Sequence, residues 1–425
     1  MIILIAVIII LFIILALWRL DLAVIATIGL LPTYLVRFSV GPVPFTLLEA
    51  LVLIVALVFF FRFRLYRLAY LKQAIDKVPF KFPLLLLFAA ATLAVLVSPN
   101  LRGALGEWRA YFVEAIIFYI VFVNVIVWRR HIKYVLYALG ISALVVSVYA
   151  IIQHFTGINI PAPWHAADLR RVTAWYEYPV AVALYLAPIV GLFIAQLFFR
   201  RHSKIIVAWP FALAVVAAGV LAVYYTHSRG ALVAILITLA VLSFFTKYRW
   251  YIVSIIVIAV LILAFIPGVS DRFVDVFTGD DNSTNVRLVM WKGTLKMLKD
   301  NWFLGAGLSG FQSLYDVYRE ARHTELLLYP HSLFLNFWVE LGLIGLAAFV
   351  WLLVAYFRRV KRALKSNMDR AVLFGSLAAM LVLLIHGLID VPYFKNDLAI
   401  LFLVIIGIFT AGYELSKNKN SAQPS

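Results

Sequence analysis

The sequence contains no cysteine in its 425 residues. This absence excludes structural disulfides and metal sites with thiolate ligands. Charged residues are also scarce, at 13% of the chain, and acidic residues are the rarer kind, with 20 Asp and Glu against 37 Lys and Arg. Because about a quarter of the residues in an ordinary soluble domain are charged, this composition excludes that class.

Apolar residues fill the chain instead, at 65% of the sequence with a mean hydropathy of +1.01. Runs of about 17 to 25 apolar residues, which can cross about 30 Å of hydrocarbon as helices, recur along the sequence. We therefore expect an all-α polytopic membrane protein with about 12–13 transmembrane helices. The spans are predicted at 2–18, 22–37, 45–61, 83–98, 110–128, 134–155, 179–199, 205–226, 230–246, 250–267, 333–357, 371–390 and 397–414.

Two of these spans need comment. The second is interrupted by Pro32 and closed by Arg37, which indicates a broken or re-entrant segment. Residues 1–18 lack a basic leader and a small-residue cleavage site, so we interpret them as a retained span. The whole chain, 1–425, is then a single integral membrane domain.

The basic residues orient the chain, because Lys and Arg prefer the cytoplasmic side of short membrane loops. Alternate connections collect 23 of the 37 Lys and Arg residues, and we assign that side to the cytoplasm. Three segments then lie outside the cytoplasmic (inner) membrane: 161–179, 226–230 and the long extracytoplasmic loop 268–330. The net charge of +17 is therefore a topology signal and an attraction to anionic membrane lipids, and we expect no nucleic-acid partner.

Arginines on the outer side, where basic residues are disfavoured, call for an anionic partner. Three predicted spans also begin on this side, and each helix N-terminus presents free N–H groups and about half a positive charge, which favours phosphate. The span starts and the polar residues just before them are Pro179 after Arg170 and Arg171, Gly230 after Ser228 and Arg229, and Leu333 after His331; Arg287 lies in the long loop.

Several cations and helix ends could therefore converge on one multiply charged anion. The planar fork of an arginine grips phosphate oxygens in pairs. A diphosphate attached to a lipid would fit, because its tail could lie between helices while its head group stays at the interface. We assign Arg170, Arg171 and Ser228 to binding the diphosphate of the donor.

An ordered set of motifs carries a family resemblance. The motifs are RRVTAWYEYP (170–179), SRGA (228–231), RLVMW (287–291), GAGLSGF (305–311), PHSLFLNFWVELGLIG (330–345) and HGLIDVPYFKND (386–397). In this order, over about residues 140–400, the sequence resembles the O-antigen ligase and polymerase superfamily. That resemblance implies a membrane glycosyltransferase of the GT-C-like fold that uses undecaprenyl diphosphate as the lipid carrier and needs no metal or other cofactor.

The resemblance also implies roles for matching residues. The arginine of the SRG motif is Arg229, the arginine of the loop is Arg287 and the histidine is His331, while Arg171 matches the arginine before a span. The implied reaction moves a glycan from an undecaprenyl-diphosphate-linked donor to a glycan, lipid or protein acceptor at the outer face of the membrane, in the manner of an O-antigen ligase.

We expect a single inverting displacement at the anomeric carbon of the donor. Arg229, Arg287 and Arg171 would stabilise the negative charge that grows on the leaving diphosphate. His331 would take the proton of the acceptor hydroxyl or, alternatively, bind the diphosphate as a cation. Glu340, inside the same apolar run, is interpreted as a buried hydrogen-bond partner for loops or neighbouring helices.

Other polar and aromatic residues allow two interpretations. Trp291 could stack on a sugar ring or simply lie at the membrane interface. Tyr393 and Lys395 could contact substrate, although they lie with His386 and Asp390 at a predicted span end where a structural ion pair would also explain them. GAGLSGF is interpreted as a turn, and Asp280 and Asp281 as solvated loop carboxylates, not metal ligands.

Two alternatives to a ligase remain at this stage. The chain could polymerise lipid-linked repeat units, because the shared motifs do not separate polymerases from ligases. A transporter of lipid-linked sugars is an alternative of another class. A transporter should place its charged groups along a pathway at the membrane midplane, whereas these arginines and the histidine gather at one face.

Overall fold

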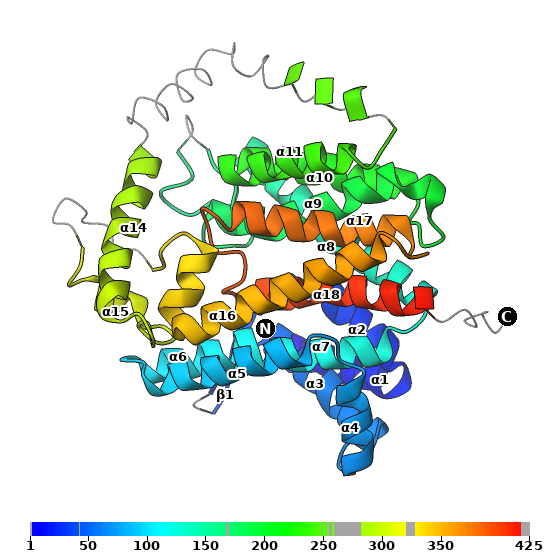
Figure 1. Cartoon of the computed structure of the whole chain (residues 1–425), viewed down its shortest axis with the longest axis horizontal. Coiled ribbons are helices and arrows are strands. Elements are labelled where there is room, and N and C mark those ends of the chain that lie inside the picture. The colour runs from blue at the N-terminus through cyan, green and yellow to red at the C-terminus, as the bar shows by residue number, and fades with distance from the viewer. Residues whose placement is uncertain are drawn as a thin grey trace.

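The computed structural model describes residues 2–41, 43–166, 170–247, 249–251, 253–254, 257–258, 282–319 and 328–417. Its helices run side by side in one bundle (Figure 1). The first half contains α1 (Ile2–Trp18), α2 (Leu20–Gly29), η1 (Leu31–Leu35), β1 (Arg37–Val40), β2 (Val43–Thr46), α3 (Leu47–Arg62), α4 (Leu68–Asp76), α5 (Lys81–Leu96), α6 (Leu101–Glu107), the π-helix η2 (Trp108–Val113), α7 (Glu114–Val125), α8 (Arg129–Thr156) and α9 (Pro179–Phe198). The second half contains η4 (Arg200–His202), α10 (Trp209–Tyr225), α11 (Arg229–Ser243), α14 (Asn282–Asp300), α15 (Phe311–Tyr315), α16 (Leu333–Ala363), α17 (Arg370–His386) and α18 (Asn396–Lys417).

The all-α polytopic fold is confirmed. Among the described residues, five helices are long and apolar enough to cross a membrane: Leu101–Val125, α8, α9, α16 and α18. The helices α4 and α5 form a pair that is bent by 106°, and counting this pair as one span raises the total to six. Five further apolar helices are shorter. The total of about 12–13 spans stays a prediction, since most of 250–267 lies outside the described residues.

The second predicted span is broken. After α2 the chain turns through η1, which contains Pro32, and then pairs β1 with β2 in an antiparallel hairpin whose register joins Arg37 to Thr46. Proline has no N–H for a helical hydrogen bond, which explains why α2 does not continue through this segment. Thr46 then starts α3 with a capping box, in which its hydroxyl accepts from the Glu49 N–H and the Glu49 carboxylate accepts from the Thr46 N–H.

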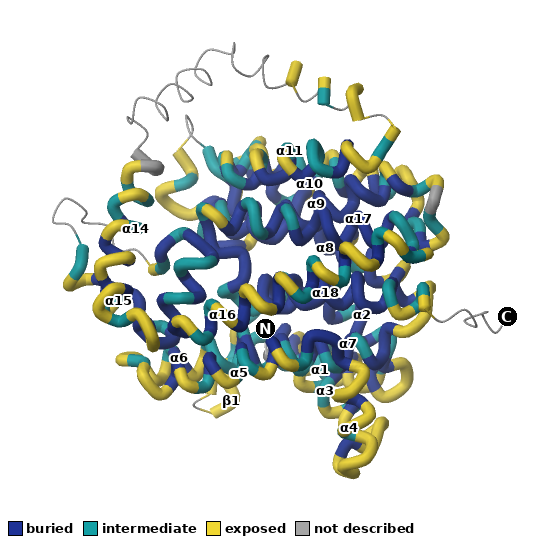
Figure 2. Tube along the Cα trace, in the orientation of Figure 1, coloured by how far each residue is buried: buried dark blue, intermediate teal, exposed yellow. Residues whose placement is uncertain are grey.

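The centre of the bundle is built from α9 and α18. In the most apolar stretch of each helix 83% is buried inside the protein, against 50% for α8. Helices that are apolar all round belong in an interior. Figure 2 shows this buried centre, with exposed residues concentrated on elements such as α4 and α14. Gly191 lets α9 approach α17, since a Cβ at that position would lie 3.3 Å from the Ala378 carbonyl oxygen.

A smaller second core forms where α14 and α15 pack against the first part of α16. It contains Met290, Met297, Leu298, Ala306, Phe311, Tyr315 and Val339. The segment expected as a loop therefore includes helices that dock on the bundle. In Figure 1, α14 and α15 lie at one end of the bundle, whereas α4 and the end of α18 lie toward the other.

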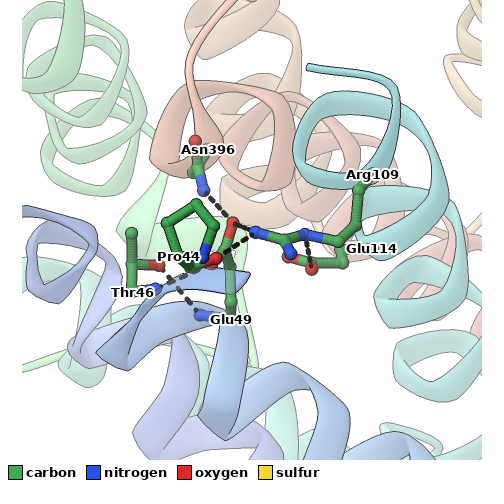
Figure 3. A network of polar contacts seen from close by, with 6 residues as sticks. All are labelled: Pro44, Thr46, Glu49, Arg109, Glu114 and Asn396. Carbon is green, nitrogen blue, oxygen red and sulfur yellow. Dashed lines mark hydrogen bonds and ion pairs between the residues drawn. The ribbon is translucent and has the colours of Figure 1, made fainter. Parts of the chain in front are cut away.

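A buried polar network ties the N-terminal helices to α18 (Figure 3). Arg109 on η2 pairs with Glu49 of α3 at 3.0 Å and with Glu114 of α7 at 3.4 Å, and donates to the Pro44 carbonyl oxygen. Asn396, the first residue of α18, donates to the same Glu49 carboxylate at 3.1 Å. Buried carboxylates are expensive unless paired, and the pairing here joins residues of five elements: β2, α3, η2, α7 and α18.

Candidate functional site

Three helices begin where the sequence predicts spans to begin. They are α9 at Pro179, α11 at Arg229 and α16 at Leu333. The segment 387–395, which joins α17 to α18, contacts the starts of the last two. The Leu333 N–H donates to the Gly387 carbonyl oxygen at 2.7 Å, and a Cβ on Gly230 would lie 2.4 Å from the Ile389 side chain. The starts of α11 and α16 therefore lie against one segment.

His331 and Asp390 face each other beside these helix starts. The Nδ1 atom of His331 lies 3.8 Å from Oδ1 of Asp390, which is ion-pair distance but longer than a hydrogen bond. The Asp390 side chain is 3% exposed and that of His331 is 26% exposed, so the carboxylate lies behind the imidazole. Burial alone would raise the pKa of Asp390, but His331 and then His386 hold it below its ordinary value.

Arg287 lies near the same groups. Its charge acts on the His386 imidazole together with that of Asp390. Burial and the charge of Asp390 raise the pKa of Tyr329, and the charge of Arg287 opposes that rise. The arginine of the long loop, the end of α17 and the residues before α16 are thus neighbours in space, although about a hundred residues separate them in sequence.

Arg171 and Arg229 form the next part of the cluster. The Arg171 Nε donates to the Thr226 carbonyl oxygen at 3.0 Å, and its guanidinium lies 4.8 Å from the centre of the Trp164 ring. Burial lowers the pKa of Arg171, and the like charge of Arg229 lowers it further. Two arginines held this close repel each other, which a bound anion would relieve. A Cβ added to Gly230, next to Arg229, would lie 3.2 Å from the His386 ring, so this pair is close to the histidine.

On the other side of His331 lies a group of aromatic residues with a lysine. The rings of Tyr329 and His331 are 4.6 Å apart, and the Tyr329 hydroxyl donates to that of Tyr178 at 3.3 Å. The Lys395 ammonium lies 4.2 Å from the centre of the Tyr178 ring. Tyr178 precedes α9, so the start of the third helix also joins the cluster. Lys395 is therefore linked to His331 through the rings of Tyr178 and Tyr329, and its assignment to substrate contact stays a prediction.

Two predicted residues lie elsewhere. Arg170 donates to the His154 carbonyl oxygen at 2.8 Å, at the end of α8, where an arginine complements the negative end of the helix dipole. The structure gives it this capping contact and does not bring it into the cluster. Tyr393 is 1% exposed among aromatic side chains, and its hydroxyl donates to the Tyr111 carbonyl oxygen at 3.0 Å. The ring is thus part of the core, and its expected substrate contact stays a prediction.

Of two further predicted residues, Ser228 lies directly before α11 and Trp291 bonds to the protein backbone. Ser228 is the buried residue before α11 and its hydroxyl does not cap the helix. The indole N–H of Trp291 donates to the Pro330 carbonyl oxygen at 2.8 Å. Its bonding group is thus occupied by the protein, which argues against a role for that group in sugar recognition.

Glu340 makes the buried contact expected of it. Its carboxylate accepts from the Ser309 N–H at 2.7 Å, inside the GAGLSGF segment, which forms a turn as predicted. Close by, α16 is kinked at Gly342, whose φ is 67° and ψ −172°. A Cβ there would lie 2.2 Å from the Phe303 carbonyl oxygen, so the glycine admits the close approach of this turn.

Sequence reasoning did not single out Tyr178 and Tyr329. Tyr178 lies inside the quoted motif 170–179 and Tyr329 lies just outside the motif 330–345, each directly before a proline, so their places beside helix starts were the only signal. Asp390 was left between a structural and a site role, and its contact with His331 favours the site. Asp280 and Asp281 lie outside the described residues. Within the described ranges, no group of three His, Asp or Glu side chains could hold a metal ion.

One comparison with known proteins identifies a family likeness. Residues 212–350, about a third of the chain, match the family model described as O-antigen ligase. The matched stretch includes Ser228, Arg229, Arg287, Trp291 and His331, and it ends before Asp390. The resemblance to the O-antigen ligase and polymerase superfamily is thereby confirmed. A search of curated proteins found none that matches the chain.

Proposed function

We propose, from the premise that the chain has an O-antigen ligase-like or polymerase-like function, that it is an inverting glycosyltransferase of the inner membrane. It would move a glycan from an undecaprenyl-diphosphate-linked donor to an acceptor hydroxyl on the extracytoplasmic face. The observation that carries this proposal is the gathering of three helix starts, with Arg171, Arg229 and Arg287 on one side of a His331–Asp390 pair.

The arginines bind the diphosphate and stabilise its charge as it leaves. In the displacement, the acceptor oxygen forms a bond to the anomeric carbon while the bond from that carbon to the diphosphate oxygen breaks. Negative charge then grows on the diphosphate, and cations fixed in advance in a poorly hydrated site stabilise it without reorganising. Arg229 and Arg287 act directly, and Arg171, held by its bond to the Thr226 carbonyl oxygen, adds charge. The starts of α9 and α11 add helix-dipole charge, with Ser228 at the second of these.

His331 takes the proton that the acceptor hydroxyl must lose. If Nδ1 carries its hydrogen toward Asp390, Nε2 is left as the proton acceptor, which is the arrangement of a base oriented by a carboxylate. Lys395 and Tyr178 contact the substrate beside His331. Arg170 lies next to Arg171 in sequence, and it contributes to donor binding only through the position of Arg171.

Two alternatives are weaker. A polymerase would use the same site with a lipid-linked glycan as acceptor, so only the acceptor distinguishes it from a ligase. A transporter is less consistent with the site, because the cations lie where helices start and do not line a path along the bundle.

The test is an assay with purified protein reconstituted in lipid and supplied with a defined undecaprenyl-diphosphate-linked oligosaccharide. We expect the glycan to pass to an added acceptor with inversion at the anomeric carbon and release of the diphosphate, in the presence of a chelator. Supplying lipid A core, a wall polymer, a protein or a second lipid-linked unit identifies the acceptor. Movement of the donor across the bilayer with its glycan intact would support a transporter and overturn the proposal.

A further inference from the structure

The peptide that leads into His331 is held in an unusual way. His331 has a φ of 43°, in the left-handed region that residues with side chains rarely adopt. Such a conformation persists when the surrounding structure fixes it, and it is common at functional sites. The contacts on either side of His331 therefore decide where the imidazole points.

Two hydrogen bonds fix this backbone. Before His331, the carbonyl oxygen of Pro330 accepts from the indole N–H of Trp291 at 2.8 Å. After it, the Leu333 N–H donates to the Gly387 carbonyl oxygen at 2.7 Å. Because a peptide bond is planar, holding the Pro330 oxygen fixes the orientation of the whole Pro330–His331 peptide unit. Trp291 supplies the first of these bonds from α14, a different element of the structure.

We propose that Trp291 is a positioning residue, whose indole holds the Pro330–His331 peptide so that the imidazole faces Asp390. This inference rests on the proposed function, in which His331 is the base. The loss of the bond lowers the rate of the chemical step and leaves the binding of donor and acceptor unchanged.

The position of Trp291 on α14 extends the inference. It lies four residues after Arg287, and residues four apart share one face of a helix. Next to it, Met290 is fully buried in the small core that docks α14 on α16. One face of α14 thus carries both Arg287, which binds the donor diphosphate in the proposed function, and Trp291, whose indole N–H bonds to Pro330. The docking of α14 on α16 consequently positions both Arg287 and His331.

The experiment compares Trp291→Phe with Trp338→Phe. Trp338 is a matched control, because its indole N–H also donates to a backbone carbonyl oxygen, that of Trp302, at 2.7 Å, but this bond does not touch the His331 peptide. A neutral hydrogen bond is worth about 0.5–1.5 kcal/mol, so Trp291→Phe should lower kcat about 2- to 13-fold. The KM values for donor and acceptor should stay within about twofold, and Trp338→Phe should retain the wild-type kcat.

A double-mutant cycle with His331→Ala separates positioning from other roles. If Trp291 acts through His331, adding Trp291→Phe to His331→Ala causes no further loss of the residual activity. An additive loss, or a raised KM for either substrate, would show that Trp291 contacts substrate directly and would overturn the inference. Wild-type activity in His331→Ala would instead overturn the proposed function, so the two failures are distinguishable.

A reciprocal variant covers the case in which Trp291→Phe unfolds. Trp291→Gln keeps an N–H donor at similar reach but removes the ring. A kcat closer to wild type than that of Trp291→Ala supports the hydrogen bond as the acting feature. Equal loss in the Gln and Ala variants assigns the effect to the ring and counts against positioning through Pro330.

Discussion

At the scale of the residue, the proposed site depends on the shape of the arginine side chain as well as its charge. Arg229→Lys and Arg287→Lys should each slow turnover about tenfold to more than a hundredfold, because an ammonium cannot rebuild the paired bonds of a guanidinium to phosphate. Each charge-assisted bond is worth roughly 1.5–3 kcal/mol, which corresponds to that range. The measurement is the rate of glycan transfer by folded, membrane-inserted protein. Near-normal transfer by both variants would remove the clamp from the proposal.

The lowered pKa of Asp390 predicts a pH-dependent contribution to stability. A carboxyl group whose folded pKa is depressed stabilises the protein above its ordinary pKa, near 3.9, and loses that contribution as the pH falls through the folded value. Asp390→Asn should therefore lower the unfolding temperature at pH 7, and the difference from wild type should shrink between about pH 5 and pH 3. Thermal unfolding in detergent across this range checks it, with Asp316→Asn as a control at an exposed ion pair. A difference that does not change with pH would contradict the assignment.

Residue identity could be predicted where motifs carried it and not where tertiary contacts decide. Arg229, Arg287 and His331 were found from their motifs, and the structure brings them to one region. Arg170 and Arg171 are adjacent in sequence, yet one reaches the end of α8 and the other the end of α10. No local pattern separates two neighbouring arginines, because the direction of each side chain depends on helices that are distant in sequence.

At the scale of the element, the kink in α16 should be sensitive to a single methyl group. Gly342 combines a φ of 67° with a ψ of −172°, a region open almost only to glycine, and its added Cβ would clash with the Phe303 backbone. Gly342→Ala should destabilise the protein by at least about 1–3 kcal/mol from the backbone conformation alone. Gly106→Ala is the matched control, since a Cβ there meets nothing within 4 Å. Equal unfolding temperatures for the two variants would refute this account of the kink.

The positions of the helices followed from the lengths of the apolar runs, whereas only some breaks within helices could be predicted. Pro32 announced the end of α2, because a proline disrupts helical hydrogen bonding whatever surrounds it. Gly342 gave no such signal, since glycine is tolerated in membrane helices and the apolar run continues through it. The kink arises because the turn formed by residues 303–305 packs closely against α16. Sequence periodicity does not record such a non-local contact.

At the scale of the whole molecule, the orientation in the membrane is still a prediction and can be tested directly. The chain has no cysteine, so single cysteines report their own accessibility. Lys296→Cys lies at an exposed position of α14, and Asn367→Cys at an exposed position between α16 and α17. In intact cells, an impermeant thiol reagent should label the first and spare the second. The reverse pattern would place the candidate site on the cytoplasmic side.

The overall architecture was predictable because solvent decides it. Sixty-five per cent apolar residues and basic connections that alternate along the chain fix a helical membrane protein and its expected sidedness. The docking of α14 and α15 was not predicted, because their second core is small and uses residues such as Met290 and Phe311 that composition alone does not distinguish from interface anchors.

The Arg109 network has a consequence for where this chain can be divided. Glu49, Arg109 and Glu114 all precede the stretch that matches the O-antigen ligase family, yet Asn396 and Tyr393, from the segment behind the candidate site, bind to Glu49 and to the backbone at Tyr111. A fragment that begins after α7 would leave these partners without their acceptors. The N-terminal third is therefore a structural part of the protein that the matched stretch cannot replace. If the chain were split between α7 and α8, the two pieces would have to reassemble across these contacts before any activity could return.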